Sequence, residues 1–160
     1  MSFVADLNCG HVGEFVFWNL FTNLPTVKEV IDVRRDKGFQ NWDVDFLVKD
    51  VKEQITWIEV KTDYKTFHTG NIVYEYQTSG NIGCYEKTKA DYIAYYVPQS
   101  GNIYILKTEE LRRLVRTHDY KLMKVSNDTT GYLISLGDLE RYGVVKGVYQ
   151  AERIPDGRVD

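Results

Sequence analysis

The fold of this chain depends on two runs of sequence, NWDVDFLV at 41–48 and ITWIEVK at 55–61. Both are rich in β-branched and aromatic residues and a polar turn at 49–54 separates them, so the sequence predicts a β-hairpin. Successive side chains of a strand point to opposite faces of the sheet. Alternation therefore puts Glu59 and Lys61 on one face of the second strand, and Asp43 and Asp45 on one face of the first. The expected result is a compact cluster of carboxylates with one amine.

A Glu-x-Lys triplet alone carries little information, because it arises by chance in roughly half of chains of this length. The alternative interpretation of Glu59 and Lys61 is an exposed ion pair worth about 0.2–1 kcal/mol. Its context favours a functional site. The triplet ends an apolar strand, Asp45 lies on the preceding strand, and a further acid lies on a helix upstream.

That further acid is Glu14. The segment VGEFVFWNLF at 12–21 predicts a helix that is apolar almost all round and therefore largely buried. Glu14 shares a face with Trp18 and Phe21, where a carboxylate is unfavourable unless it is paired or directed at a cation. The alternative is that Glu14 lies in an exposed first turn and complements the helix dipole.

The order of these elements resembles the PD-(D/E)xK nuclease superfamily, over roughly the first hundred residues. By this resemblance, Asp45 corresponds to the lone Asp of the motif, Glu59 to its second acid, Lys61 to its lysine and Glu14 to the accessory acid of the helix. No Pro precedes Asp45, and Asp43 lies two residues before it. Which of the two binds metal is open, and Asp45 is favoured because the strand continues beyond it. The segments TGNIVYEY at 69–76 and TKADY at 88–92 are similar to small phage-type members of the superfamily.

The resemblance implies a Mg²⁺-dependent deoxyribonuclease that hydrolyses DNA phosphodiester bonds, with Mn²⁺ as a substitute. Mg²⁺ prefers oxygen ligands and keeps several waters. Asp45, Glu59 and the backbone carbonyl of Val60 would supply such ligands, with Asp43 as the alternative. The metal would lower the pKa of a bound water, and Lys61 would orient that water and stabilise developing charge. The resemblance also places the protein in phage DNA replication, recombination or repair.

The net charge of −3 argues against a protein that binds nucleic acid through overall basicity. A nuclease must then gather positive charge locally, and scattered surface charge is the alternative. The candidate DNA-binding residues are Arg35, Lys65, His68, Lys87 and Lys89. Glu75 and Gln77, on a strand expected at 72–77, are further site candidates, and ordinary exposed strand residues are the alternative.

Length and composition predict one α+β domain over 1–153, with a central mixed sheet flanked by helices and a flexible tail at 154–160. The resemblance implies a restriction-endonuclease-like core. The chain has no apolar stretch near 18 residues and no signal-peptide pattern. We therefore expect a protein of the cytoplasm, that of the host for a phage protein, with no membrane partner. Cys9 and Cys84 are expected to be free thiols.

Other elements follow from local signals. Strands are expected at 27–35, 92–97 and 103–106, a turn at 36–38, and helices at 108–116 and 135–143. Two rivals to a nuclease remain. One is a non-catalytic nucleic-acid-binding or protein-interaction module that retains the fold, and the other is an unrelated structural protein with a fortuitous triplet. A homodimer is left open.

Overall fold

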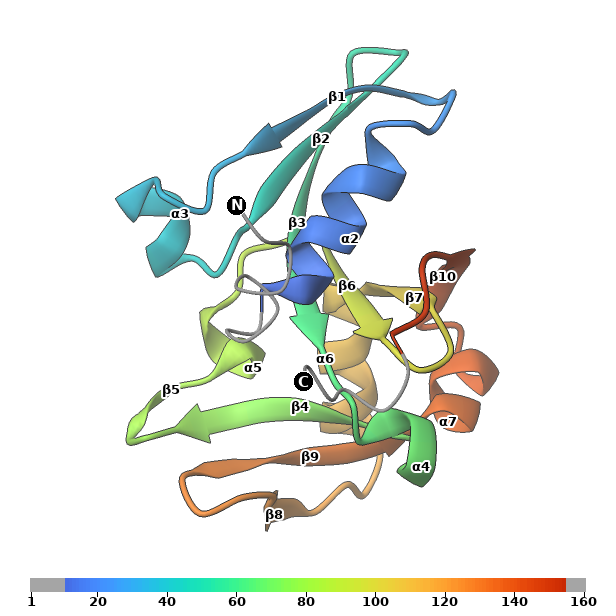
Figure 1. The fold of residues 1–160 in the computed structure, drawn as a ribbon. Helices are drawn as coiled ribbons and strands as arrows, with labels where there is room; N and C mark the ends of the chain where they lie inside the picture. Colours follow the sequence, from blue (N-terminus) through green and yellow to red (C-terminus); the bar gives the residue numbers. More distant parts are fainter. Residues whose placement is uncertain (1–10, 155–160) are drawn as a thin grey trace.

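The computed structural model describes residues 11–154, which fold into two β-sheets and six helices (Figure 1). The larger sheet has the spatial order β1 (Val27–Asp32), β2 (Phe46–Asp50), β3 (Ile55–Thr62), β6 (Tyr92–Val97), β7 (Asn102–Lys107) and β10 (Val145–Gln150). The smaller sheet has the order β5 (Asn81–Ile82), β4 (Asn71–Thr78), β9 (Thr129–Ser135) and β8 (Leu122–Lys124). The helices are α2 (Val12–Phe21), α3 (Lys37–Asn41), α4 (Thr66–Thr69), α5 (Cys84–Lys87), α6 (Thr108–Thr117) and α7 (Leu136–Arg141). This arrangement confirms the predicted α+β class.

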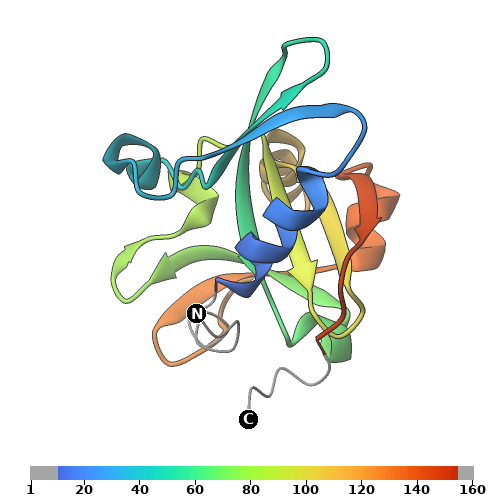
Figure 2. The same cartoon turned by 45° about the horizontal axis from the view of Figure 1, so that its top comes forward.

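The six-stranded sheet is mixed, because β3 and β6 run parallel while its other neighbouring strands are antiparallel. Parallel strands require a crossover connection. Here the crossover between β3 and β6 contains α4, β4, β5 and α5. Two strands of the smaller sheet therefore belong to the connection between two central strands of the larger sheet (Figure 2). The same connection brings β4 and α5 against the end of β3.

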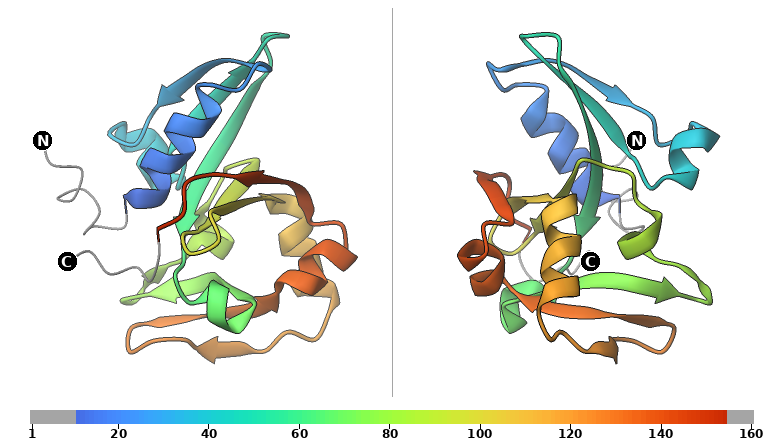
Figure 3. Two further views of the ribbon diagram at one scale, coloured as in Figure 1. Left: turned by 45° about the vertical axis from the view of Figure 1, so that its right-hand side comes forward. Right: turned by 180° about the vertical axis from the view of Figure 1, so that it is seen from behind.

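Two hydrophobic cores lie on the two faces of the larger sheet. On one face, α2 packs Val16 and Phe17 against Ile58 and Val60 of β3. On the other face, the larger sheet packs against the smaller sheet and α6, so α2 and α6 lie on opposite sides (Figure 3). Side chains alternate along β3, so Glu59 and Lys61 point to the opposite face from Ile58 and Val60, toward the space between the sheets. Helix α2 is buried on one face only, since Phe15 is 48% exposed.

The predicted hairpin is confirmed, with Phe46 opposite Ile58, but its first strand begins later than expected. Helix α3 occupies 37–41, where the sequence predicted a turn and then a strand, because the Asp36 side chain caps it by accepting from the N–H groups of Gly38 and Phe39. Asp43 follows in a left-handed conformation with φ of 48°. The prediction that Asp43 and Asp45 share one face of a strand is therefore wrong.

Near the C-terminus, the chain lies along the larger sheet up to the last described residue, Ile154. Its N–H donates to the carbonyl of Pro98 (2.8 Å), and its side chain packs against the core under α2. Residues 155–160 of the expected tail, and Cys9, lie outside the described part of the chain. Within that part, no helix has both the length and the apolar character needed to cross a membrane.

Gly13 sets how closely α2 approaches the end of β3. A Cβ at this position would overlap Thr62 Oγ1 and lie 3.3 Å from Cγ1 of Val60. Thr62 Oγ1 is buried and has no hydrogen-bond partner within residues 11–154. The absence of a side chain at Gly13 therefore fixes the position of the first turn of α2, which carries Glu14.

We predict that Gly13→Ala destabilises the protein by about 1–3 kcal/mol, because overpacking outweighs the roughly 1 kcal/mol by which Ala is the better helix former. Denaturant unfolding measures the free energy of unfolding. In a Thr62→Ala background, which removes the overlapping atom, the same substitution should lose most of its effect. A stabilising Gly13→Ala in the wild-type background would contradict the close approach.

Candidate active site

Glu59 is the most deeply buried charged residue of the site, at 3% exposure. It points from β3 into the space between the sheets, opposite Ile93 of β6. Its Oε1 lies 3.0 Å from Lys61 Nζ, and its Oε2 accepts a hydrogen bond from the Cys84 thiol of α5 (3.0 Å). Burial raises the pKa of Glu59, although the positive charge of Lys61 opposes this shift.

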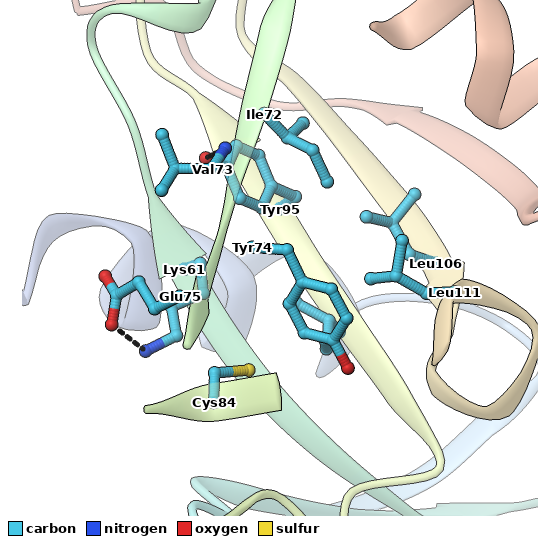
Figure 4. Close-up of a pocket in the computed structure, with 10 residues that line it drawn as sticks. Lys61, Ile72, Val73, Tyr74, Glu75, Cys84, Tyr95, Leu106 and Leu111 are labelled. Atoms are coloured by element: carbon cyan, nitrogen blue, oxygen red, sulfur yellow. Dashed lines mark hydrogen bonds and ion pairs between the residues drawn. The ribbon is translucent and has the colours of Figure 1, made fainter. Parts of the chain in front are cut away.

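Lys61 lies on the same face of β3, as alternation predicts, and is held between two acids. Its Nζ is 3.9 Å from Oε2 of Glu75 on β4 (Figure 4), in addition to its contact with Glu59. Burial alone would lower the pKa of Lys61, but the negative charges of Glu59 and Glu75 outweigh it, and the pKa is raised well above its ordinary value. Lys61 therefore remains a cation that donates protons in hydrogen bonds and does not act as a base.

Asp45 comes directly before β2 and is fixed by the backbone of β3. Its N–H donates to the carbonyl of Ile58 (2.9 Å), and its Oδ2 accepts the N–H of Val60 (2.8 Å). The pKa of Asp45 is raised to about 7, mainly by burial and further by the negative charges of Glu14 and Glu59. Its carboxyl group thus lies within electrostatic reach of two other acids.

Glu14 joins the cluster from α2, with its side chain 15% exposed. Its Oε2 accepts from Arg34 Nη1 (2.9 Å) and lies 2.7 Å from His11 Nδ1. Arg34 also pairs with Asp32, and hydrogen bonds to these two acids raise the pKa of its guanidinium group. Glu14 is therefore neither fully exposed nor unpaired. It lies at the edge of the cluster with Arg34 as its partner.

Asp43, the alternative metal ligand, is turned toward α5. Its Oδ1 lies 3.1 Å from Lys87 Nζ, while its charge still raises the pKa of Glu59. Lys87 thereby pairs with an acid of the cluster. Neighbouring Lys89, another candidate for DNA binding, lies with its Nζ 4.9 Å from the ring centre of Trp42.

The remaining sequence-predicted residues are scattered around this centre. Lys65 and His68 lie at the exposed α4 end of the crossover, and Arg35 is exposed before α3. Glu75 comes close to Lys61, whereas Gln77 is exposed beyond a register shift in β4 between these two residues. β-bulges of this kind re-aim side chains near functional sites.

The hydrogen bond between Cys84 and Glu59 was not predicted from the sequence. Burial raises the pKa of the Cys84 thiol well above the ordinary value, and the charge of Glu59 adds to this effect. It is therefore a neutral hydrogen-bond donor to the carboxylate. A cavity of about 10 Å³, about the smallest that admits a water molecule, lies beside Cys84, Lys61 and Glu75 (Figure 4). Nothing in the spacing of the sequence links Cys84 to Glu59, because α5 reaches it through the long crossover.

The donor set of the cluster suits a hard divalent cation in type and charge. Three carboxylates converge from α2, the start of β2, and β3, and their mutual repulsion contributes to the raised pKa of Asp45. Within residues 11–154, however, no three His, Cys, Asp or Glu side chains form a group arranged to hold a metal ion. Glu59 instead faces Lys61 and Cys84, and Glu14 faces Arg34. A cation would have to compete with them.

Comparisons with protein-family models, with curated proteins and with solved structures give no match to this chain. The residues themselves provide buried carboxylates, one ammonium group and a shielded position at the strand ends. Such an arrangement can concentrate a cation, orient a water molecule and stabilise negative charge that develops on a phosphate.

The raised pKa of Asp45 predicts a specific pH dependence of stability. The ordinary pKa of an Asp is 3.8, whereas folded Asp45 titrates at about 7. Between these values the folded protein binds more protons than the unfolded chain, so wild-type stability falls as pH rises through this window. Asp45→Asn removes the titration and keeps an oxygen for the Val60 N–H. We expect the variant to be more stable than wild type by about 1–4 kcal/mol near pH 8, and by much less near pH 4.

Denaturant unfolding in chelator, at several pH values, measures this difference. The matched control is Asp119→Asn, which removes an exposed carboxylate in the turn after α6 and should give no gain that grows with pH. A variant that is less stable than wild type at alkaline pH would show that the Asp45 carboxylate is stabilising in the fold.

Proposed function

We propose that the protein is a Mg²⁺-dependent deoxyribonuclease that hydrolyses DNA phosphodiester bonds. The observation that supports this most is the convergence of Glu14, Asp45 and Glu59 from three separate elements beside protonated Lys61. Clustered buried carboxylates oppose folding, so their presence together favours a functional reason over a structural one. The resemblance to the PD-(D/E)xK superfamily points in the same direction, and it alone supports a role in phage DNA replication, recombination or repair.

In this proposal the carboxylates of Asp45 and Glu59, with the carbonyl of Val60, hold the metal. A bound Mg²⁺ would lower the pKa of a coordinated water and neutralise charge on the scissile phosphate. Lys61 donates hydrogen bonds to the attacking water or to the phosphate oxygens, since it stays protonated. Glu75 and Glu59 keep its ammonium group at the strand end.

The second candidate is a nucleic-acid-binding or protein-interaction module that has the fold without the chemistry. One observation favours it: Lys61 and Arg34 already compensate the charges of Glu59 and Glu14 within the protein. Metal dependence separates the two candidates, because a module of this kind needs no divalent ion to bind its partner and leaves DNA intact.

We predict that Mg²⁺ or Mn²⁺ supports cleavage of a supercoiled plasmid or a labelled single strand and that Ca²⁺ does not, since Ca²⁺ accepts longer bonds and looser geometry.

Asp45→Asn and Glu59→Gln should each weaken Mg²⁺ binding in calorimetry and also reduce turnover. Full activity in excess chelator would exclude the metal mechanism. An inactive Asp43→Asn beside an active Asp45→Asn would keep the nuclease and move the ligand two residues upstream.

Lys61→Ala is predicted to reduce the single-turnover rate by about 10²–10³, while metal binding survives, because the lysine serves the transition state. Removing a cation beside Glu59 should leave Mg²⁺ affinity equal to or tighter than that of wild type. Lys52→Ala, in the exposed β2–β3 turn, is the control for loss of one positive charge. Cleavage by Lys61→Ala at the wild-type rate would show that Glu59 and Lys61 form only a structural ion pair.

A further inference from the structure

A cleft of about 600 Å³ opens directly from the candidate active site. Lys61 and Glu75 lie at its inner end, and it extends past the β3–α4 turn to the start of the β8–β9 turn. Its floor includes Val73 and Leu133, which are paired across β4 and β9. Their neighbours in sequence, such as Ile72 and Ile134, are in the core, so the floor is the face of the smaller sheet that points away from the core.

Three lysines line this cleft, Lys61, Lys65 and Lys124, against two acids, Asp63 and Glu75, so positive charge is in excess. Asp63 on its wall accepts from the Tyr95 hydroxyl (2.6 Å) and from the N–H of Lys65 (2.7 Å), and Glu75 faces Lys61. Lys65 comes from the β3–α4 turn and Lys124 from the end of β8; both are exposed, and neither forms an ion pair with any residue in 11–154. Two ammonium groups are thus available to a ligand, while Glu75 is paired with Lys61 and Asp63 is held by neutral donors.

The uncharged lining of the cleft is part polar and part apolar, and its apolar part includes Tyr64, Val73 and Leu133. Tyr64 lies at the rim, and its backbone carbonyl accepts from Gln99 Nε2 (2.6 Å). Together with Val73 and Leu133 it offers a surface on which a flat ring can rest. A ligand that matches both features carries separated negative charges and flat apolar groups, which is the chemistry of a nucleic-acid strand with unpaired bases. In a duplex the base faces are stacked on each other and unable to reach such a floor.

We propose that this cleft binds a single-stranded segment of the DNA substrate, with its phosphates at Lys65 and Lys124 and its bases on Tyr64 and the apolar floor. The segment flanks the phosphodiester that reaches Lys61, so the substrate is single-stranded at, or directly beside, the position of cleavage. The binding itself is independent of metal. Only the link to cleavage rests on the proposed nuclease function.

The experiment measures fluorescence anisotropy of a labelled oligothymidylate and of a labelled hairpin duplex, with the full chain in chelator. Lys65→Ala/Lys124→Ala is compared with the control Lys52→Ala/Lys121→Ala, which removes the same charge from exposed positions outside the cleft. Tyr64→Leu tests stacking. Salt titration of each variant counts the phosphate contacts.

We expect wild type to prefer the single strand, and the cleft double variant to lose roughly 10- to 100-fold in affinity at low salt, with a salt slope smaller by about 1.4, since each phosphate contact with a single strand contributes about 0.7. Tyr64→Leu should lose roughly tenfold with the slope unchanged. Equal losses in the control, or tighter binding of the duplex, would overturn the proposal. If cleavage with Mg²⁺ does not depend on Lys65 and Lys124, only the proposed strand-binding cleft is wrong. If the wild type binds the strand but does not cleave it, only the proposed nuclease function is wrong.

Discussion

The charge of Glu59, buried between the two sheets, is the constraint on which the rest of the structure depends. A carboxylate in such a position is unfavourable without compensation. The compensation comes from Lys61 on its own strand and from the Cys84 thiol on α5, which the β3–β6 crossover delivers. The β3–β6 crossover therefore does more than connect two strands: it supplies both the donor to Glu59, from α5, and the second acid, Glu75 on β4, that holds Lys61.

Much of the centre was predictable because it depends on local order. The helix at 12–21, the hairpin at 46–62 and the shared face of Glu59 and Lys61 all follow from apolar periodicity and strand alternation. Glu14 and Asp45, on either side of the centre, were also predictable, but the ion pair between Arg34 and Glu14 was not.

The errors have different physical causes. Asp36 caps a short helix at a place where its neighbours suggested only a turn, and this shifts Asp43 off the strand. The smaller sheet pairs β4 with β9 across more than fifty residues, and no local pattern specifies that pairing. For the same reason, Lys124 could not be placed near Lys61 from sequence alone. Contacts between distant segments form the cleft, whereas contacts along one hairpin bring Asp45 and Glu59 together.

The Tyr95 hydroxyl joins the two sheets, because it donates to Asp63 after β3 and accepts the N–H of Val73 on β4 (3.2 Å). The length of one phenol ring thus sets the separation of the two walls at the inner end of the cleft. The consequence is mechanical. For the strand binding proposed above, a link of this kind would hold the two walls apart before the ligand arrives, and less of the protein would have to be ordered on binding.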